Sequence, residues 1–345
     1  MEVWQHTLRQ ALVDPAELAE RFDVAVAPLQ EVAQRYPMRI SRYYFDLIEA
    51  PGDAVWRQCV PDLRELTDPT LSPDPLDEGR LSPVPAVVHR YPDRVLLLAG
   101  SDCATYCRFC TRKRKLGCSS MKVSEAELHA GIDYVADHSE VRDVLLSGGD
   151  PLLLEDDQLE AILLRLSAIP HVEMVRIGSR LPVTLPERIT DNLCKLLRRF
   201  PPLYLNTHFN HPRELTPQAA AACNKLVDAG VVLGNQTVLL RGVNDSAVTL
   251  ARLWRGLLRL RVRPYYLHHM DLVRGTGHFR TRIETGLGIL QELRGPLSGM
   301  ALPHYVIDSP GGRGKIPLLP ESILRLGEQA LLRAPGGETI EFPNH

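Results

Sequence analysis

Short apolar runs alternate with amphipathic stretches along most of the chain after residue 90. Seven of these runs have the length of buried strands, and they lie at 95–99, 144–146, 174–177, 203–205, 231–233, 265–267 and 305–307. Stretches with helical periodicity separate them, such as 124–138 and 156–169. Strands that alternate with helices of this length are typical of βαβ units around a parallel sheet. The pattern therefore predicts an α/β fold whose sheet closes into a barrel or partial barrel.

The two ends of the chain have a different pattern. Residues 1–80 are polar and helical, and Pro15 directly after Asp14 is a typical helix start. Five prolines from Thr67 to Pro85 indicate an irregular linker. We therefore predict an N-terminal helical segment with its linker at 1–80, the partial barrel at 81–320 and a C-terminal tail at 321–345.

Polar residues follow successive predicted strands, at 101–110, 147–150, 178–180, 207–211, 235–236 and 270–271. In a (β/α) barrel the carboxyl ends of the strands meet at one face, and the active site forms there. A series of polar endings on neighbouring strands therefore predicts one site at that face.

Composition limits the classes of partner. The chain has 345 residues, which suffices for one large α/β barrel with an appended segment or for two medium domains. No apolar stretch approaches the ~20 residues that cross a bilayer, so we expect no membrane partner. A net charge of −2 gives no basis for binding nucleic acid. The sequence starts without the charged and apolar regions of a signal peptide, and we expect a cytoplasmic protein.

Three cysteines stand close together after the first barrel strand. Cys103, Cys107 and Cys110 have the spacing C-x3-C-x2-C. Ordinary four-iron electron-transfer clusters take four thiolates, so a set of three indicates a cluster whose fourth iron stays open for a substrate. Cys118 is a candidate fourth ligand, and structural zinc with a ligand from elsewhere is an alternative. Disulfides fit poorly because the chain has seven cysteines, an odd number.

A second candidate centre is the glycine-rich loop that ends at Lys315. Its glycines let the backbone come close to an anion or a planar cofactor, and a lysine in a dry pocket can form a Schiff base with an aldehyde such as pyridoxal phosphate. Most such loops are only turns, so the loop alone does not decide. Arg90 and Arg94 precede the first barrel strand, either as a surface pair or as a phosphate clamp.

Taken together, these motifs resemble the lysine 2,3-aminomutase family of radical S-adenosylmethionine (SAM) enzymes. The resemblance covers most of the chain and rests on motifs in the same order and with similar spacing, at 90–94, 103–112, 146–150, 176–180, 206–212, 240–245 and 310–315. It implies a partial (β/α)6 barrel of the radical SAM type with a [4Fe-4S] cluster, SAM on its open iron and pyridoxal 5′-phosphate (PLP). An external electron donor would reduce the cluster.

The resemblance also implies roles for individual residues. Cys103, Cys107 and Cys110 would bind the cluster. Lys315 would form the Schiff base with PLP, and Arg90 and Arg94 would bind its phosphate. SAM would be lined by Ser147, Gly148, Gly149, Asp150, Ser179, His208 and Gln236.

The substrate site implied by the resemblance consists of Arg112 for the α-carboxylate and of Asp271 and Asp308 for a remote ammonium group. Two buried acids would repel a glutamate side chain at a cost of several kcal/mol, so we expect a cationic substrate. The expected reaction is an isomerisation that moves the α-amino group of L-lysine to the β-carbon and gives β-lysine. Arginine or ornithine as substrate, a deaminase or decarboxylase with the same cofactors, and a non-catalytic metal-binding module are the alternatives.

The chain also departs from the larger members of the family. They carry C-terminal cysteines for structural zinc, joined by a cysteine at the position of Ser246, and this chain has no cysteine after Cys223. We therefore expect no zinc, and a homo-oligomer remains open. In this respect the chain resembles the shorter form of the family, similar to the elongation factor P β-lysylation accessory enzyme. Arg313 in the glycine loop is unusual and is a candidate for a further anion contact.

Overall fold

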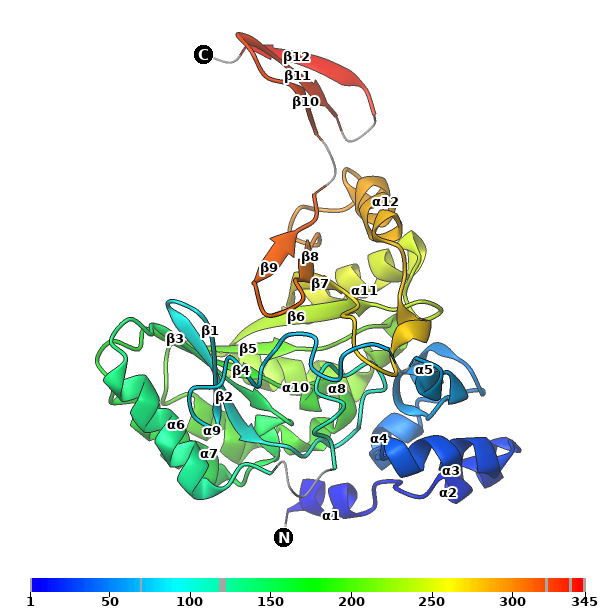
Figure 1. Cartoon of the computed structure of the whole chain (residues 1–345), viewed down its shortest axis with the longest axis vertical. Coiled ribbons are helices and arrows are strands. Elements are labelled where there is room, and N and C mark those ends of the chain that lie inside the picture. The colour runs from blue at the N-terminus through cyan, green and yellow to red at the C-terminus, as the bar shows by residue number, and fades with distance from the viewer. Residues whose placement is uncertain (1, 69, 118–121, 320–321, 335–336, 344–345) are drawn as a thin grey trace.

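A computed structural model gives the structure of the chain (Figure 1), and it describes residues 2–68, 70–117, 122–319, 322–334 and 337–343. Cys118, the candidate fourth ligand, lies outside the described residues. Within them, nine strands form one sheet in the order of the sequence. They are β1 (Val87–Tyr91), β2 (Arg94–Gly100), β3 (Asp143–Gly148), β4 (Met174–Gly178), β5 (Leu203–Thr207), β6 (Val232–Leu239), β7 (Arg263–His269), β8 (His304–Asp308) and β9 (Lys315–Pro317).

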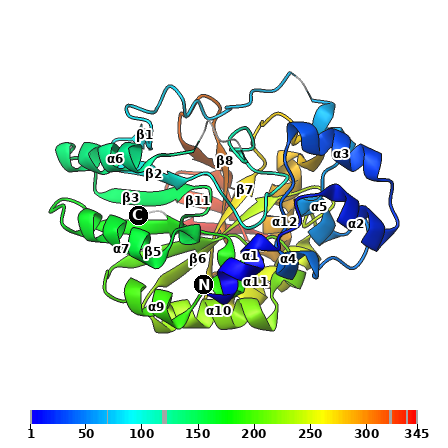
Figure 2. The same ribbon diagram turned by 90° about the horizontal axis from the view of Figure 1, so that it is seen from below.

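Strands β2 to β8 are parallel to one another, and an antiparallel strand lies at each edge. β1 pairs with β2, and β9 pairs with β8. Six of the seven predicted apolar runs fall within these strands, and the run at 231–233 overlaps β6, which begins at Val232. Figure 2 shows the sheet curled, with helices on its outer side. The prediction of a parallel α/β partial barrel is confirmed.

The barrel helices follow the strands in alternation. They are α6 (Glu125–Asp137), α7 (Asp156–Ser167), α8 (Leu181–Thr184), α9 (Asp191–Leu197), α10 (Pro217–Asp228), α11 (Ala247–Arg259) and α12 (Ile283–Leu293). Their starts are encoded locally: Ser124 caps α6 in a capping box with Glu127, and Thr216 caps α10 ahead of Pro217. Helix α11 buries Leu250, Trp254 and Leu257, which lie three to four residues apart and so share one face.

The N-terminal segment packs on the barrel and shares its core. Its helices are α1 (Val3–Arg9), α2 (Pro15–Phe22), α3 (Val26–Arg35), α4 (Arg42–Phe45) and α5 (Ala54–Cys59). Asp14 caps α2 as its sequence predicts. The side chain of Ser41 donates to the carbonyl of Thr184, and Trp4 and Tyr44 belong to the same buried cluster as the barrel strands. Short 3-10 helices lie between the longer elements. They are η1 (Leu63–Leu66), η3 (Pro151–Leu153), η4 (Pro186–Arg188), η5 (Pro212–Glu214) and η6 (Gly277–Phe279).

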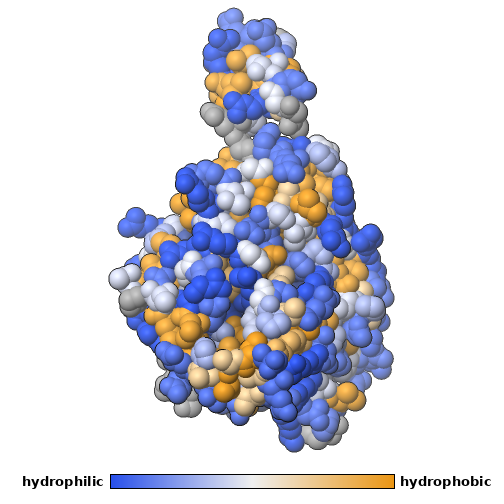
Figure 3. Space-filling model, turned by 90° about the vertical axis from the view of Figure 1, so that its right-hand side faces the viewer, coloured by the Kyte–Doolittle hydropathy of each residue, from blue (hydrophilic) through white to orange (hydrophobic). Residues whose placement is uncertain are grey.

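Three short strands after the barrel form a small antiparallel sheet that the sequence analysis did not identify. They are β10 (Ile323–Arg325), β11 (Gln329–Arg333) and β12 (Thr339–Pro343). This sheet projects from the barrel beyond β9 and α12 (Figure 1). Apolar side chains, among them Leu326 and Phe342, lie exposed on it, and the space-filling view shows apolar groups on this projection (Figure 3). Across the described part of the chain, no helix has the length and apolar character needed to span a membrane.

Candidate active site

The cysteine triplet lies in the loop that follows β2, at the carboxyl end of the parallel strands. Cys103, Cys107 and Cys110 are half-buried and form no disulfide. The N-terminal segment fixes this loop, because the backbone N–H of Tyr106 donates to the carbonyl of Arg39 (2.8 Å) and that of Arg108 donates to the carbonyl of Gln58 (2.8 Å). The loop conformation therefore depends on residues far away in the sequence.

The surroundings of the triplet disfavour free thiolates. Burial, Asp150 and the neighbouring thiols raise the pKa of Cys103 well above its usual value. Burial and Cys107 raise the pKa of Cys110 to about 11. A cation bound at the triplet would reverse this balance, because metal binding requires and stabilises the thiolate form. No set of three or more His, Cys, Asp or Glu side chains in the described ranges lies close enough to hold a single metal ion.

The turn after β3 packs directly against the cysteine loop. The N–H of Gly149 donates to the carbonyl of Gly100 (2.6 Å), and the N–H of Asp150 donates to the carbonyl of Asp102 (2.7 Å). A Cβ at Gly149 would lie 2.2 Å from that carbonyl oxygen, so only glycine permits the approach. Burial raises the pKa of the Asp150 carboxyl to about 6, although hydrogen bonds partly oppose the shift.

The remaining residues predicted to line SAM come from the next three strands. Ser179 directly follows β4, is buried, and its Oγ accepts from the N–H of Leu181 (3.1 Å). His208 follows β5, and its Nε2 is buried without a hydrogen-bond partner among the described residues. Burial and the nearby Arg180 lower the pKa of His208 far below its usual value, so the imidazole is neutral. Ser147 and Gln236 lie on β3 and β6 and are half-buried.

The second centre forms where β8 and β9 meet. Asp308 ends β8 and pairs in register with Lys315, the first residue of β9. The Nζ of Lys315 lies 2.9 and 3.0 Å from the two carboxylate oxygens of Asp308, and Nη1 of Arg90 lies 2.8 Å from Oδ1. Burial opposes ionisation, but Lys315, His268 and Arg90 outweigh it and lower the pKa of Asp308.

Arg94 contributes to this centre only indirectly. It pairs with Asp93 (2.9 Å), its side chain is 45% exposed, and its guanidinium lies 4.9 Å from the ring centroid of Tyr91. The hydroxyl of Tyr91 accepts the backbone N–H of Lys315 (3.0 Å). The sequence analysis did not assign Tyr91, although a hydroxylated aromatic residue between Arg90 and Arg94 was a signal that could have found it.

The residues predicted to bind the substrate differ in whether their side chains already have a polar partner. Oδ1 of Asp271, just after β7, is buried and has no hydrogen-bond partner in the described part of the molecule. Burial and the charge of Asp308 raise the pKa of Asp271 to about 7. Arg112 is held by Glu78, with Nε at 2.9 Å from Oε1 and Nη2 at 2.7 Å from the same oxygen. Glu78 lies in the predicted linker, and its role was missed. Arg313 is exposed.

Comparisons with known proteins identify the family of the chain. The family model of the Radical SAM superfamily matches residues 98–253, and that of Lysine-2,3-aminomutase matches residues 290–343. The L-lysine 2,3-aminomutase of Fusobacterium nucleatum is 47% identical over 93% of this chain and 77% of its own length. That of Clostridium subterminale is 46% identical over 93% of this chain and 79% of its own length.

The chain belongs to the lysine 2,3-aminomutase family. Its curated relatives are isomerases, and the chain is an enzyme of this class. The family also includes a glutamate 2,3-aminomutase of Clostridioides difficile, which is 43% identical over 91% of this chain and 75% of its own length. Among solved structures, a radical SAM methyltransferase from Sphaerobacter thermophilus matches 66% of this chain and 72% of its own with a TM-score of 0.48 and 19% identity.

A radical SAM domain of this family implies a [4Fe-4S] cluster and SAM, and the residues at the first centre fit both. Three half-buried cysteines lie in one loop, and thiolates are the usual ligands of iron–sulfur clusters. The unpartnered Nε2 of His208 is an open hydrogen-bonding group at the same strand ends.

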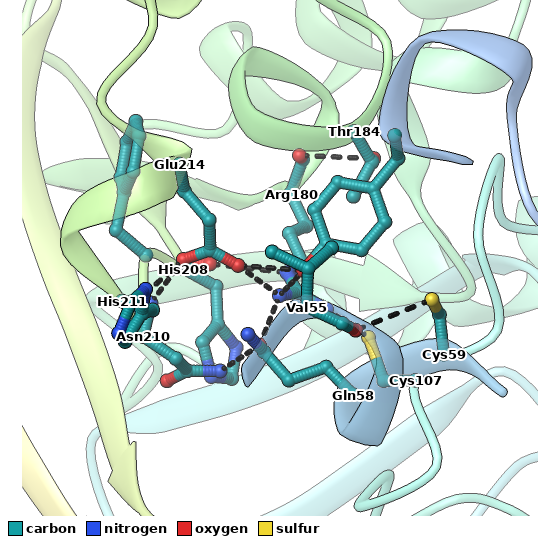
Figure 4. Close-up of polar contacts among 12 residues, drawn as sticks. Val55, Gln58, Cys59, Cys107, Arg180, Thr184, His208, Asn210, His211 and Glu214 are labelled. Carbon is teal, nitrogen blue, oxygen red and sulfur yellow. Dashed lines mark hydrogen bonds and ion pairs between the residues drawn. The ribbon is translucent and has the colours of Figure 1, made fainter. Parts of the chain in front are cut away.

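Arg180 is a further residue of the first centre that the sequence analysis did not assign. It follows β4, and its guanidinium contacts Cys107 as well as residues of the N-terminal segment (Figure 4). The partners lie up to 136 positions away in the sequence. No local motif connects residues at such separations, so only the fold could reveal this contact.

Proposed function

We propose that this enzyme moves the α-amino group of L-lysine to the β-carbon and so produces β-lysine, with a [4Fe-4S] cluster, SAM and PLP as cofactors. The observation that carries the proposal is the unpartnered, buried carboxylate oxygen of Asp271 beside Asp308 and Lys315. A buried acid without a partner is a site prepared for a cation. The identity to the L-lysine enzymes supports the same substrate.

The first centre would hold the cluster and SAM. Cys103, Cys107 and Cys110 would bind the cluster, and the cluster and SAM together would supply radical chemistry when an external donor provides one electron. The turn formed by Gly148, Gly149 and Asp150 keeps backbone groups close to this loop. Ser147, Ser179, His208 and Gln236 would line the rest of the SAM site.

The second centre would hold PLP, which supplies electron delocalisation to the migrating amino group. Lys315 would hold its aldehyde, and Arg90 would bind its phosphate with a planar guanidinium fork. Arg94 and Tyr91 would complete the phosphate site. In the structure Asp308 forms ion pairs with both Lys315 and Arg90, and these pairs keep the two cations in place before a cofactor binds.

Two of the residues that would bind the substrate are already paired with other side chains, and the substrate would take the place of these partners. Arg112 is held by Glu78, and a substrate α-carboxylate would share or replace this contact. Asp308 would accept the remote ammonium group once Lys315 is engaged elsewhere. Asp271 has no partner that must be displaced, so it would be the first residue to contact the cationic end of the substrate. The side chain of glutamate would instead add a third negative charge, at a cost of several kcal/mol.

The experiment that tests this proposal is anaerobic turnover of the reconstituted enzyme with L-lysine, L-arginine, L-ornithine and L-glutamate, followed by mass spectrometry. We expect L-lysine to give a product of unchanged mass that elutes as β-lysine. A lower mass would indicate a deaminase or decarboxylase, and turnover of another amino acid would reassign the substrate. Lys315→Ala should lose the pyridoxal absorbance and at least about 1,000-fold in turnover, because covalent catalysis is lost, while its iron content stays unchanged.

A further inference from the structure

Arg180 lies at the junction of the barrel, the cysteine loop and the N-terminal segment. It directly follows β4, and its side chain is 9% exposed. Its Nη1 donates to Sγ of Cys107 at 2.7 Å. The other donated bonds run from Nε to the carbonyl of His208 (3.1 Å) and from Nη2 to Oε1 of Gln58 (2.6 Å), Oε1 of Glu214 (2.9 Å) and the hydroxyl of Tyr44 (3.1 Å). Figure 4 shows Gln58, Cys107 and Glu214 around the Arg180 side chain.

The partners of Arg180 are themselves fixed. Glu214 is fully buried, and its Oε1 also accepts from the hydroxyl of Tyr44 (2.6 Å). Its Oε2 accepts the backbone N–H groups of Asn210 (2.6 Å) and His211 (2.9 Å). Gln58 is buried as well, and its Oε1 accepts from Nδ2 of Asn210 (3.0 Å). Because Nε and Nη2 are anchored in this way, Nη1 of the planar guanidinium can point only at the sulfur.

The charges around Arg180 leave it cationic. Burial disfavours the charged form of a guanidinium, but arginine stays protonated in proteins, and Oε1 of Glu214 lies 2.9 Å from Nη2. Glu214 balances one positive charge, so the guanidinium and Glu214 together remain neutral in the absence of a thiolate. A thiolate at Cys107 would then receive a charge-assisted N–H···S hydrogen bond from a preorganised donor.

Arg180 also contacts the turn after β3 through its backbone. Its N–H donates to Oδ2 of Asp150 (2.7 Å), and the N–H of Asp150 is bonded in turn to the cysteine loop at Asp102. One residue is thus tied to a cysteine of the triplet by its side chain and to the neighbouring turn by its main chain. Rotation of the side chain away from the sulfur would break its bonds to Gln58 and Glu214, whereas a shift of the main chain would break the bond to Asp150.

We propose that Arg180 is a positioning residue that donates a hydrogen bond to the Cys107 ligand of the cluster and thereby raises the reduction potential of the cluster. The inference rests on the proposed binding of the cluster by the three cysteines. Hydrogen bonds to cluster sulfurs and nearby net charge are established determinants of cluster potential. One-electron reduction adds a negative charge to the cluster, and a fixed cation on a ligand sulfur stabilises this charge. An external one-electron donor then reduces the cluster more readily.

The test compares midpoint potentials in the reconstituted enzyme by titration with dithionite, followed by electron paramagnetic resonance. Arg180→Gln should lower the equilibrium constant for one-electron reduction about tenfold, which is about 59 mV for a one-electron couple. Arg180→Lys, which keeps the charge but loses the fork, should fall between Arg180→Gln and the wild type. Intact iron and sulfide content with an unchanged potential in Arg180→Gln would overturn the proposal.

Arg176→Gln is the matched control. Arg176 lies on the same strand, β4, but pairs with Asp143 (2.8 Å), the first residue of β3 at the opposite end of the barrel. Its removal should leave the midpoint potential unchanged. An equal shift in both variants would mean that general loss of positive charge, and not the bond to Cys107, sets the potential, and the proposal would be wrong.

A second measurement covers the case in which Arg180→Gln takes up no iron. Wild-type enzyme labelled with ¹⁵N in its arginine guanidinium groups should show a weak ¹⁵N coupling to the reduced cluster in electron–nuclear double resonance. The side chains of Arg108 and Arg112 are paired with Glu65 and Glu78. If the enzyme holds the cluster and cleaves SAM but shows no coupling, the proposed role of Arg180 is wrong and the proposed function still stands. If the wild-type protein holds no cluster, the proposed function is wrong as well.

Discussion

Asp271 and Asp308 differ in how their charges are balanced. Asp308 is paired with Lys315 and Arg90, and these cations keep it ionised. Asp271 has a buried oxygen without a partner, and its pKa is raised to about 7 by burial and by Asp308. The difference matters because a cationic substrate needs the carboxylate form of both acids.

The raised pKa of Asp271 predicts a pH-dependent affinity for lysine. Below pH of about 7 Asp271 holds a proton in the free enzyme, which must leave before an ammonium group binds, so KM should rise by up to about tenfold per pH unit. Asp271→Asn should raise KM at pH 8 and remove this dependence. Initial rates between pH 6 and 9 provide the measurement. Asp133→Asn, at an exposed acid on α6, is the control, and a pH-independent KM in the wild type would contradict the prediction.

The ion pairs of Glu78 with nearby cations should contribute measurably to the free energy of unfolding. It is buried, contacts Arg112 closely, and lies 3.5 Å from Arg114 and 3.8 Å from Lys115. Glu78→Gln leaves these cations uncompensated and should reduce the free energy of unfolding by about 2–3 kcal/mol, less than for a fully buried pair because the cations are partly solvated. Urea unfolding tests this, and the exposed Glu173→Gln should change it by less than about 0.5 kcal/mol. Equal effects would mean that the Glu78 contacts contribute no more than a surface pair.

At the scale of elements, the turn after β3 is the most constrained part of the site. A Cβ at Gly149 would meet the carbonyl of Asp102, whereas a Cβ at Gly288, in the exposed part of α12, would meet nothing within 4 Å. Gly149→Ala should lower stability by about 1–3 kcal/mol through overpacking and should weaken SAM binding. Gly288→Ala should raise stability by about 0.5–1 kcal/mol, because alanine is the better helix residue. Thermal unfolding and SAM titration measure both, and a neutral Gly149→Ala would show that the turn relaxes freely.

Sequence periodicity predicted the long elements because each has a single buried face or a fully buried run. The runs at 95–99 and 144–146 lie within β2 and β3, and the caps of α2 and α6 are local motifs. Helix α8 has only four residues, too few for a period, and β10 to β12 are mostly exposed and so lack a buried apolar run; none of them was identified. At the site, the triplet and Lys315 were recognisable as motifs, but Glu78 and Arg180 act through partners that folding alone brings near.

At the scale of the whole molecule, the two ends of the chain differ in how they join the barrel. The N-terminal helices share the barrel core, and their residues Tyr44 and Gln58 accept hydrogen bonds from Arg180. In the C-terminal sheet, Ala330 is the one buried apolar residue within the described positions of 322–343. An element with so little buried surface opens independently of the core.

This difference predicts opposite results for two truncations. Removal of residues 320–345 should leave the iron content unchanged and shift the apparent Tm of the barrel by less than about 3 °C, since the barrel core is untouched. Removal of residues 1–60 should abolish cluster binding, because the cysteine loop loses its contacts with Arg39 and Gln58. Iron analysis and circular dichroism give the readout. Cluster binding after the N-terminal truncation would contradict this account of the loop.

The central claim is the intramolecular movement of an amino group, and an isotope label tests it most directly. L-lysine with ¹⁵N at the α-amino group is incubated anaerobically with the reconstituted enzyme, SAM, PLP and dithionite, and the product is analysed by nuclear magnetic resonance. The account predicts that the ¹⁵N is bonded to carbon 3 of β-lysine. Recovery of the label as free ammonia, or only on carbon 2 of unchanged lysine in an enzyme that cleaves SAM, would contradict it.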